Sequence, residues 1–98
     1  MKKKALIIGL GISGKAAAEF LLFLGYEVTG VDRKEQKLEG LDITFFKEEK
    51  ITSLKEYSLT VLSPGIPLTH PLVQLAKKEG IEVIGEVELA LRHMKQPA

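Results

Sequence analysis

The stretch IIGLGISGKAAAEFL, residues 7–21, decides the fold of this 98-residue chain. It begins with the end of an apolar run, contains three glycines spaced G-x-G-x-x-G, and continues with helical periodicity. A glycine turn between a buried strand and a helix leaves the first N–H groups of the helix unpaired, at the positive end of its dipole. The stretch therefore predicts a strand–turn–helix unit with an anion site at the turn.

Each glycine of this turn has its own physical use. Gly9 permits a tight turn out of the strand, Gly11 lets the backbone approach a ligand, and Gly14 lets the helix pack closely on the sheet. Ser13 adds a hydroxyl donor beside the exposed N–H groups. The alternative is that the glycines serve turning and packing alone, so the pattern needs support from the rest of the chain.

Short apolar runs alternate with helical patterns along the rest of the sequence. We expect strands at residues 5–8, 26–31, 42–46, 59–62 and 81–84, and helices that begin at Gly14, Pro71 and Gly85. In the last helix Val87, Ala90, Leu91 and Met94 recur at helical spacing. The charged stretch 33–40 is expected to be a loop, and residues 47–57 to hold one or two helical turns at most. The alternation predicts an α/β fold, a Rossmann-like three-layer sandwich of about five parallel strands with helices on both faces.

The composition restricts the classes of function. One domain is expected from 98 residues, of which 45% are hydrophobic and 28% charged. The chain has no cysteine and its two histidines are not at ligand spacing, so we expect no metal site. A net charge of +1 gives no bulk attraction to nucleic acid, and no apolar run is long enough to span a membrane. We therefore expect a cytoplasmic protein with neither a nucleic-acid nor a membrane partner.

Three segments are expected to meet at the carboxyl edge of the sheet, where ligands bind in this fold. They are the glycine turn, the run Asp32-Arg33-Lys34 and the run Ser63-Pro64-Gly65. Asp32 follows Gly11 at about the 20-residue spacing of a ribose-binding carboxylate. The same carboxylate can accept a hydrogen bond from the ring N–H of uracil. Arg33 suits the 2′-phosphate of NADP, whereas Arg33 and Lys34 together suit a base edge or phosphate of a UDP compound.

The stretch LSPGIPLTHP, residues 62–71, distinguishes these ligands. Ser63 offers a donor, Gly65 allows close approach, and Pro64 and Pro67 limit the conformations of the loop. A rigid loop beside the nucleotide site can contact whatever extends beyond the phosphates. A purely structural turn is the alternative interpretation.

With these stretches the chain resembles the N-terminal domain of the Mur ligases, specifically the branch that adds D-glutamate. The resemblance is carried by IIGLGISG, VDRK and LSPGIPLTHPLVQLAKKEGIEVIGEVELA, and it covers essentially the whole chain. It implies cytoplasmic enzymes of bacterial peptidoglycan synthesis that use ATP and magnesium to form an acyl phosphate, which the amine of D-glutamate attacks. It also implies three domains, of which the N-terminal one is Rossmann-like and holds the UDP part of UDP-N-acetylmuramoyl-L-alanine.

The resemblance assigns roles to residues of this sequence. Gly11, Ile12 and Ser13 would embrace the uridine and diphosphate, Asp32 and Arg33 would contact the uracil, and Ser63, Pro64 and Gly65 would lie along the diphosphate and muramoyl portion. Where the family often has a small hydroxyl residue and then arginine after the aspartate, this chain has Arg33 and then Lys34. The uracil contact is therefore expected through the backbone of Arg33, and Lys34 is a candidate phosphate ligand.

The sequence contains no G-x-x-x-x-G-K-[ST] loop and no nucleophile–base pair. We therefore expect residues 1–98 to be a single N-terminal UDP-substrate-binding domain without catalytic residues, metal or cofactor of its own. The central ATP-binding and C-terminal domains, with ATP and magnesium, are expected outside this chain. Two alternatives of other classes stay open at this point: an NAD(P)-binding module of an oxidoreductase or redox sensor, and a structural domain whose glycines only shape turns.

Overall fold

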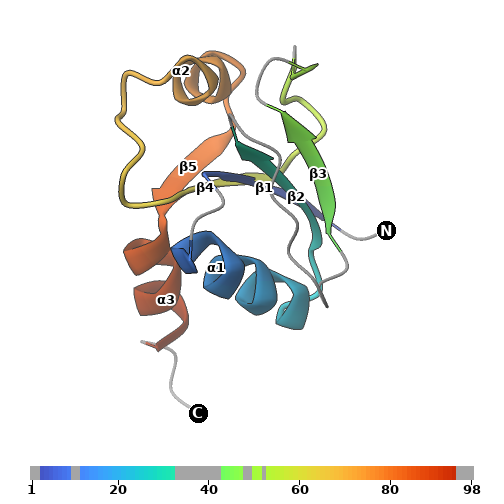
Figure 1. Cartoon of the computed structure of the whole chain (residues 1–98), viewed down its shortest axis with the longest axis vertical. Helices are drawn as coiled ribbons and strands as arrows, with labels where there is room; N and C mark the ends of the chain where they lie inside the picture. The colour runs from blue at the N-terminus through green and yellow to red at the C-terminus, as the bar shows by residue number, and fades with distance from the viewer. Residues whose placement is uncertain (1–2, 10–11, 33–42, 48–49, 52, 95–98) are drawn as a thin grey trace.

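The computed structural model of this chain describes residues 3–9, 12–32, 43–47, 50–51 and 53–94. Strands and helices alternate through this part of the chain (Figure 1). The strands are β1 (Lys4–Ile8), β2 (Glu27–Asp32), β3 (Thr44–Lys47), β4 (Leu59–Leu62) and β5 (Glu82–Gly85). The helices are α1 (Ile12–Phe23), α2 (Pro71–Lys78) and α3 (Glu86–Met94).

The strands form one parallel sheet in the order β3-β2-β1-β4-β5. α1 and α3 lie on one face of this sheet and α2 lies on the other, as Figure 1 shows. The chain runs outward from β1 to β3, returns to the other side of β1, and continues to β5. This is the strand order of a doubly wound nucleotide-binding fold, so the predicted Rossmann-like α/β sandwich is confirmed.

β1 is buried on both faces because its side chains alternate between the two helix layers. Ala5 and Ile7 belong to the core that packs against α1 and α3. Leu6 and Ile8 belong to the core that packs against α2, and all four residues are fully buried. The continuous apolar run at the start of the sequence thus forms the central strand of a covered parallel sheet.

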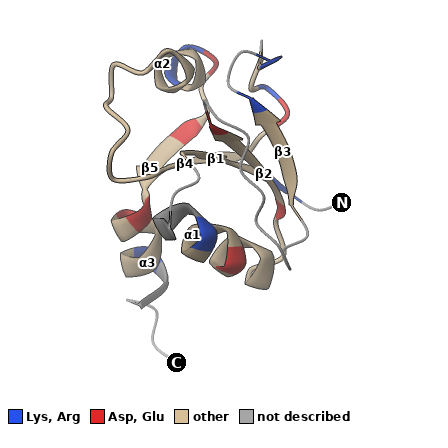
Figure 2. Cartoon of the chain, viewed as in Figure 1, with Lys and Arg blue, Asp and Glu red and all other residues tan. Residues whose placement is uncertain are grey.

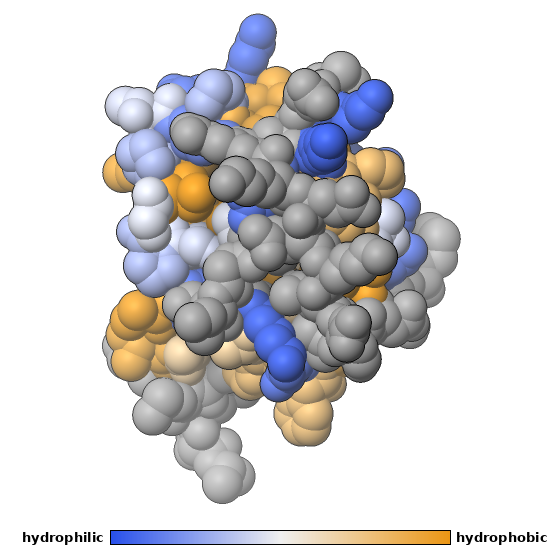
Figure 3. Space-filling view, in the orientation of Figure 1, coloured by the Kyte–Doolittle hydropathy of each residue, from blue (hydrophilic) through white to orange (hydrophobic). Residues whose placement is uncertain are grey.

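The bounds of most elements differ by one or two residues from the sequence-based expectation; α1 begins at Ile12 rather than Gly14, and α3 at Glu86 rather than Gly85. β3 covers Thr44–Lys47 rather than residues 42–46, and the expected loop at 33–40 lies outside the described residues. Among the α3 residues whose side chains are described, Leu89 is the buried one, whereas Val87 and Leu91 are 69% and 47% exposed; the side chain of Met94 lies outside the description. The apolar face formed by Val87, Ala90 and Leu91 therefore points to solvent in this domain, and apolar atoms are visible over α3 in Figure 3.

None of the helices in the described part of the chain has the length and hydrophobicity of a membrane span.

Candidate functional site

The strand register brings segments that are far apart in sequence into one row at the carboxyl edge of the sheet. Ile8 at the end of β1 lies opposite Val31 of β2 and Leu62 of β4. Leu62 in turn lies opposite Gly85 of β5. The next residues of these strands therefore follow one another across the edge in the order Asp32, Gly9, Ser63 and Glu86. The strand order reverses between β1 and β4, and ligands of such folds bind at this switch point.

Gly9 and Ser63 are in direct contact at the switch point. The hydroxyl of Ser63 donates a hydrogen bond to the carbonyl of Gly9, with an O···O distance of 2.5 Å. The φ of Gly9 is +90°, and a Cβ built on it would lie 3.1 Å from Ser63 Cβ, Ser63 Oγ and Ile66 Cγ1. Glycine is thus required here by backbone conformation and by the close approach of the Ser63–Ile66 loop. The glycine turn and the serine-proline-glycine loop form one unit.

Residues 63–66 form a tight turn beyond β4. The amide of Ile66 donates to the carbonyl of Ser63 at 3.0 Å, with Pro64 and Gly65 in the central positions. Gly65 does not have a positive φ, so its conformation is open to other residues. No atom lies within 4 Å of a Cβ built at Gly65. Neither conformation nor packing within the domain requires glycine at this exposed position.

Asp32 is the last residue of β2 and lies beside the glycine turn in the register. Its side chain is partly exposed and, by the alternation of strand residues, projects on the α1 side of the sheet. The structure therefore brings Asp32, Gly9 and Ser63 to one edge, as the sequence predicted. Pro64 and Gly65 follow directly in the exposed turn.

The structure covers the remaining predicted site residues unevenly. Ile12 and Ser13 open α1, so this helix starts directly beyond the glycine turn, and only their backbone is described. Gly11, Arg33 and Lys34 lie outside the described residues. The roles expected for these residues stay predictions.

Glu86 lies at the same edge and is not among the residues predicted for the site. It follows β5 and opens α3, and neither of its buried carboxylate oxygens has a hydrogen-bond partner among the described residues. Burial raises the pKa of this carboxyl group above its ordinary value. The rule that led to Asp32 and Ser63, a polar residue directly after a parallel strand, also applies to Glu86 and could have found it.

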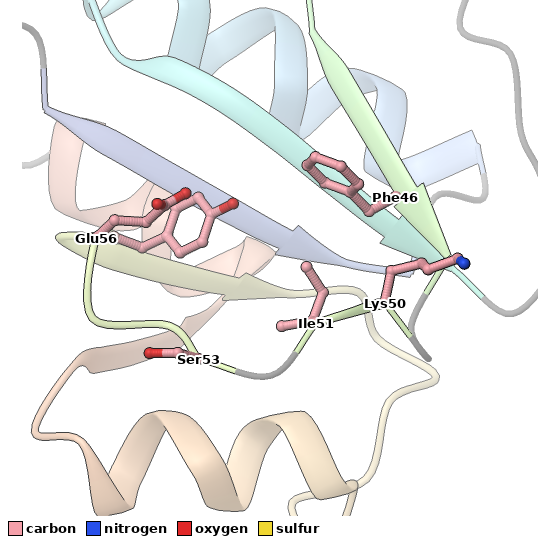
Figure 4. A pocket seen from close by; sticks show the side chains of 6 residues that line it. Phe46, Lys50, Ile51, Ser53 and Glu56 are labelled. Atoms are coloured by element: carbon pink, nitrogen blue, oxygen red, sulfur yellow. The ribbon is translucent and has the colours of Figure 1, made fainter.

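A cavity lies on the α2 side of the sheet. It has a volume of about 530 Å³ and is lined by Phe46, Lys50, Ile51, Ser53, Glu56 and Tyr57 (Figure 4). Burial raises the pKa of the Tyr57 phenol. The cavity contains none of the predicted site residues. We place the candidate site at the switch point because the glycine turn, a helix start and two strand-end polar groups converge there, whereas the cavity has no comparable convergence.

In Figure 2 the basic and acidic positions are spread over several of the described helices and strands. Arg92 of α3 lies 2.7 Å from carboxylate oxygens of both Glu82 and Glu88, and its hydrogen bond lowers the pKa of Glu82. This cluster ties α3 to β5. Among the described residues, no group of three or more His, Cys, Asp or Glu side chains could hold a metal ion.

The sequence matches a known domain family and known proteins. The family described as Mur ligase MurD-like, N-terminal domain, matches residues 3–85. The chain is 48% identical over 92% of its length to the UDP-N-acetylmuramoylalanine–D-glutamate ligase of Protochlamydia amoebophila (strain UWE25). It is 41% identical over 98% of its length to the protein of the same name from Caldanaerobacter subterraneus subsp. tengcongensis. The chain spans only 22% and 23% of the lengths of these two relatives.

A solved structure shares the fold at lower sequence identity. UDP-D-quinovosamine 4-dehydrogenase from Vibrio fischeri has a TM-score of 0.58 and 22% identity, over 95% of this chain and 87% of that chain. At this level of identity the likeness concerns the fold alone.

Proposed function

Because this chain belongs to the family of MurD-like N-terminal domains of the Mur ligases, we propose that it binds the UDP portion of UDP-N-acetylmuramoyl-L-alanine. The protein of which it forms the N-terminal domain would be the ATP-dependent ligase that adds D-glutamate in bacterial peptidoglycan synthesis. Relatives that bear the name of this ligase are 48% and 41% identical to the chain. The NAD(P)-binding alternative has no comparable support, because the matched family is one of ligases.

One observation carries the binding proposal. The loop from Ser63 to Ile66 sits directly on Gly9 at the switch point of the sheet. A ligand whose phosphates face the start of α1 therefore also meets the serine-proline-glycine turn. An extended ligand with a group beyond the diphosphate suits this arrangement better than a phosphate site alone.

The residues at this edge take distinct roles in the proposal. Gly11, Ile12 and Ser13 embrace the uridine and diphosphate, Asp32 and Arg33 contact the uracil, Lys34 is a phosphate ligand, and Ser63, Pro64 and Gly65 lie along the diphosphate and muramoyl portion. The N–H groups of the first α1 turn supply a positive end for the diphosphate. The carboxylate of Asp32 accepts a hydrogen bond from the uracil N–H.

The rest of the reaction belongs to the rest of the ligase. The chain has no Walker-type phosphate loop, and it spans less than a quarter of its relatives. We propose that ATP, magnesium and D-glutamate bind in a central ATP-binding domain and a C-terminal domain outside residues 1–98. The whole enzyme would act in the cytoplasm, where its nucleotide substrates are found.

Titration of this chain with two ligands tests the binding proposal. UDP-N-acetylmuramoyl-L-alanine is expected to shift the backbone NMR signals of Gly11, Asp32 and Ser63, whereas NADH is expected to shift none of them. Shifts with NADH alone would favour the oxidoreductase alternative. No shift with either ligand would leave only a structural role for the glycine turn.

Substitution of Asp32 in the full-length ligase tests the recognition of the base. Asp32→Ala is expected to raise the KM for the UDP substrate about 10- to 100-fold, because a charge-assisted hydrogen bond contributes about 1.5–3 kcal/mol. Little change in kcat is expected, since the uracil is remote from the reacting carboxylate. Glu27→Ala removes an exposed carboxylate at the opposite end of the same strand and is the matched control. An unchanged KM for Asp32→Ala would exclude Asp32 as a substrate ligand.

The domain assignment makes a separate prediction about activity. This chain, supplied with ATP, magnesium, D-glutamate and UDP-N-acetylmuramoyl-L-alanine, is expected to release no phosphate. Phosphate release by the purified chain above the level of a buffer control would contradict the assignment.

A further inference from the structure

We propose that Ser63 is a positioning residue, which holds the start of the anion-binding glycine turn through the carbonyl of Gly9 and does not donate to the substrate. The inference rests on the proposed function, because it concerns the same UDP site. In a direct role, the Ser63 hydroxyl would donate its one proton to the substrate. In the proposed role, it donates that proton to the carbonyl of Gly9.

A serine hydroxyl has one proton to donate, and in this structure that proton is used within the protein. The Ser63 hydroxyl donates it to the carbonyl of Gly9. What the hydroxyl still offers a ligand is oxygen lone pairs, which accept hydrogen bonds. A pyrophosphate at physiological pH also offers only acceptors, so the two would repel each other. The hydroxyl can therefore assist an anion only through Gly9.

Ser63 is itself held by the backbone on both sides. Its amide donates to the carbonyl of Ile8 at 3.1 Å, which extends the pairing of β4 with β1 by one residue. Its carbonyl accepts from the amide of Ile66 at 3.0 Å, which closes the turn that contains Pro64. The hydroxyl is therefore presented from a fixed position.

Gly9 is held from two directions. Its amide donates to the carbonyl of Val31 in β2 at 2.9 Å, and its carbonyl accepts from Ser63 beyond β4. The side chain of Ser63 thus helps to hold Gly9, the described residue that precedes the expected anion-binding turn.

The contact has no room for a longer side chain. A Cβ at Gly9 would already lie 3.1 Å from Cβ and Oγ of Ser63. Serine is the smallest residue that carries a hydroxyl on Cβ, so it combines a donor with this close approach. Alanine at position 63 would keep the approach and remove the donor.

The test compares wild-type chain with Ser63→Ala, using UDP and UDP-N-acetylmuramoyl-L-alanine as ligands. Ser63→Ala is expected to weaken both ligands by the same factor, between about twofold and tenfold, as loss of one neutral hydrogen bond implies. The carbonyl ¹³C shift of Gly9 is expected to differ between the two proteins without ligand. When UDP binds to the wild-type chain, the Gly9 carbonyl shift is expected not to move toward the value found in Ser63→Ala, because the hydrogen bond from Ser63 is kept.

Ser53→Ala is the matched control. The Ser53 hydroxyl also donates one hydrogen bond, to Oε2 of Glu79 at 3.2 Å, but it lies away from the carboxyl edge. Its loss is expected to leave UDP affinity unchanged. If Ser63→Ala proves too unstable for titration, the direction of the Gly9 carbonyl shift in the wild-type chain decides the question: an upfield movement on UDP binding, as loss of an accepted hydrogen bond produces, would overturn the inference.

Two results would overturn the inference while wild-type chain still binds UDP. One is a movement of the Gly9 carbonyl shift to the Ser63→Ala value on UDP binding, which would mean that the hydroxyl turns to the ligand. The other is a loss of affinity confined to UDP-N-acetylmuramoyl-L-alanine, which would mean a direct contact with the muramoyl portion. If the wild-type chain binds neither UDP compound, the proposed function fails, and the inference about its site fails with it.

Discussion

At Gly9, backbone conformation and packing each exclude a side chain. Its φ is +90°, and a Cβ would press against Ser63 and Ile66 at 3.1 Å. We expect Gly9→Ala to lower the free energy of unfolding by about 2–5 kcal/mol, because backbone strain of about 1–2 kcal/mol adds to an overpacking cost of about 1–3 kcal/mol. Denaturant unfolding followed by circular dichroism measures the change.

Gly25 is the matched control for this substitution. Its φ of +92° is nearly the same, but no atom lies within 4 Å of a Cβ built on it. Gly25→Ala should therefore cost only the strain of about 1–2 kcal/mol. Equal losses at Gly9 and Gly25 would show that the contact with the Ser63–Ile66 loop adds nothing to the requirement for glycine.

Gly65 is expected to behave in the opposite way. Since neither its φ nor its surroundings require glycine, Gly65→Ala should leave the free energy of unfolding unchanged within about 0.5 kcal/mol. If the substrate lies along this turn, the added methyl group meets the ligand, and the Kd for UDP-N-acetylmuramoyl-L-alanine should rise. Calorimetric titration of the stable variant measures this rise, and an unchanged Kd would remove Gly65 from the site.

The carboxyl group of Glu86 makes stability depend on pH. Because burial raises its pKa in the folded state, the unfolded chain loses this proton at lower pH than the folded chain. Stability therefore falls as pH rises from the unfolded to the folded pKa, and stays lower above it. Each tenfold difference between the acid dissociation constants of Glu86 in the folded and unfolded states lowers the free energy of unfolding at high pH by about 1.4 kcal/mol.

Glu86→Gln should remove this fall and leave the domain more stable than wild type at neutral pH. Denaturant unfolding from pH 4 to 8 gives the comparison. Glu88→Gln, at an exposed carboxylate of the same helical turn, should keep the wild-type fall. A Glu86→Gln variant with the pH dependence of wild type would show that another group causes it.

At the scale of the element, the sequence correctly predicts that α3 is a helix but does not predict which of its faces is buried. The helical spacing of Val87, Ala90 and Leu91 correctly indicates a helix, but Leu89 is the residue in the core. A helix of nine residues with apolar side chains on two faces can rest on a sheet in more than one rotation. The rotation is set by packing against β4 and β5 and by the core that α3 shares with α1, which no local pattern contains.

This rotation predicts different costs for two leucines of the same helix. Leu89→Ala should lower the free energy of unfolding by about 2–5 kcal/mol, because it leaves a cavity in the core. Leu91→Ala should change it by less than about 0.5 kcal/mol, since that side chain is 47% exposed. Thermal or denaturant unfolding of the two variants compares them, and similar costs would contradict the observed rotation.

At the scale of the whole molecule, the fold could be predicted from the sequence more completely than the candidate site. The apolar runs and the helices between them predicted the parallel sheet, and the rule for strand ends predicted that Asp32 and Ser63 share an edge. The hydrogen bond from Ser63 to Gly9 joins residues 54 positions apart, so no local pattern could indicate it. The strand-end rule could have selected Glu86, but the burial of its carboxylate comes from tertiary packing around the start of α3, which no local pattern indicates.

The strand order also predicts how stability is distributed through the sheet. β1 pairs with β2 on one side and β4 on the other, and residues 5–8 are fully buried. β3 pairs only with β2 among the described strands, and most of its residues are exposed. Local opening of β3 breaks one set of pairings and exposes little apolar surface, whereas opening of β1 disrupts both cores.

Native-state hydrogen exchange should therefore separate these strands. Amides of β1 are expected to exchange only with global unfolding, and amides of β3 at a free energy at least about 2 kcal/mol lower. Low concentrations of denaturant should accelerate exchange in β1 with the slope of global unfolding and leave β3 nearly unaffected. A common exchange free energy for β1 and β3 would mean that the sheet opens as one unit and that β3 does not open separately.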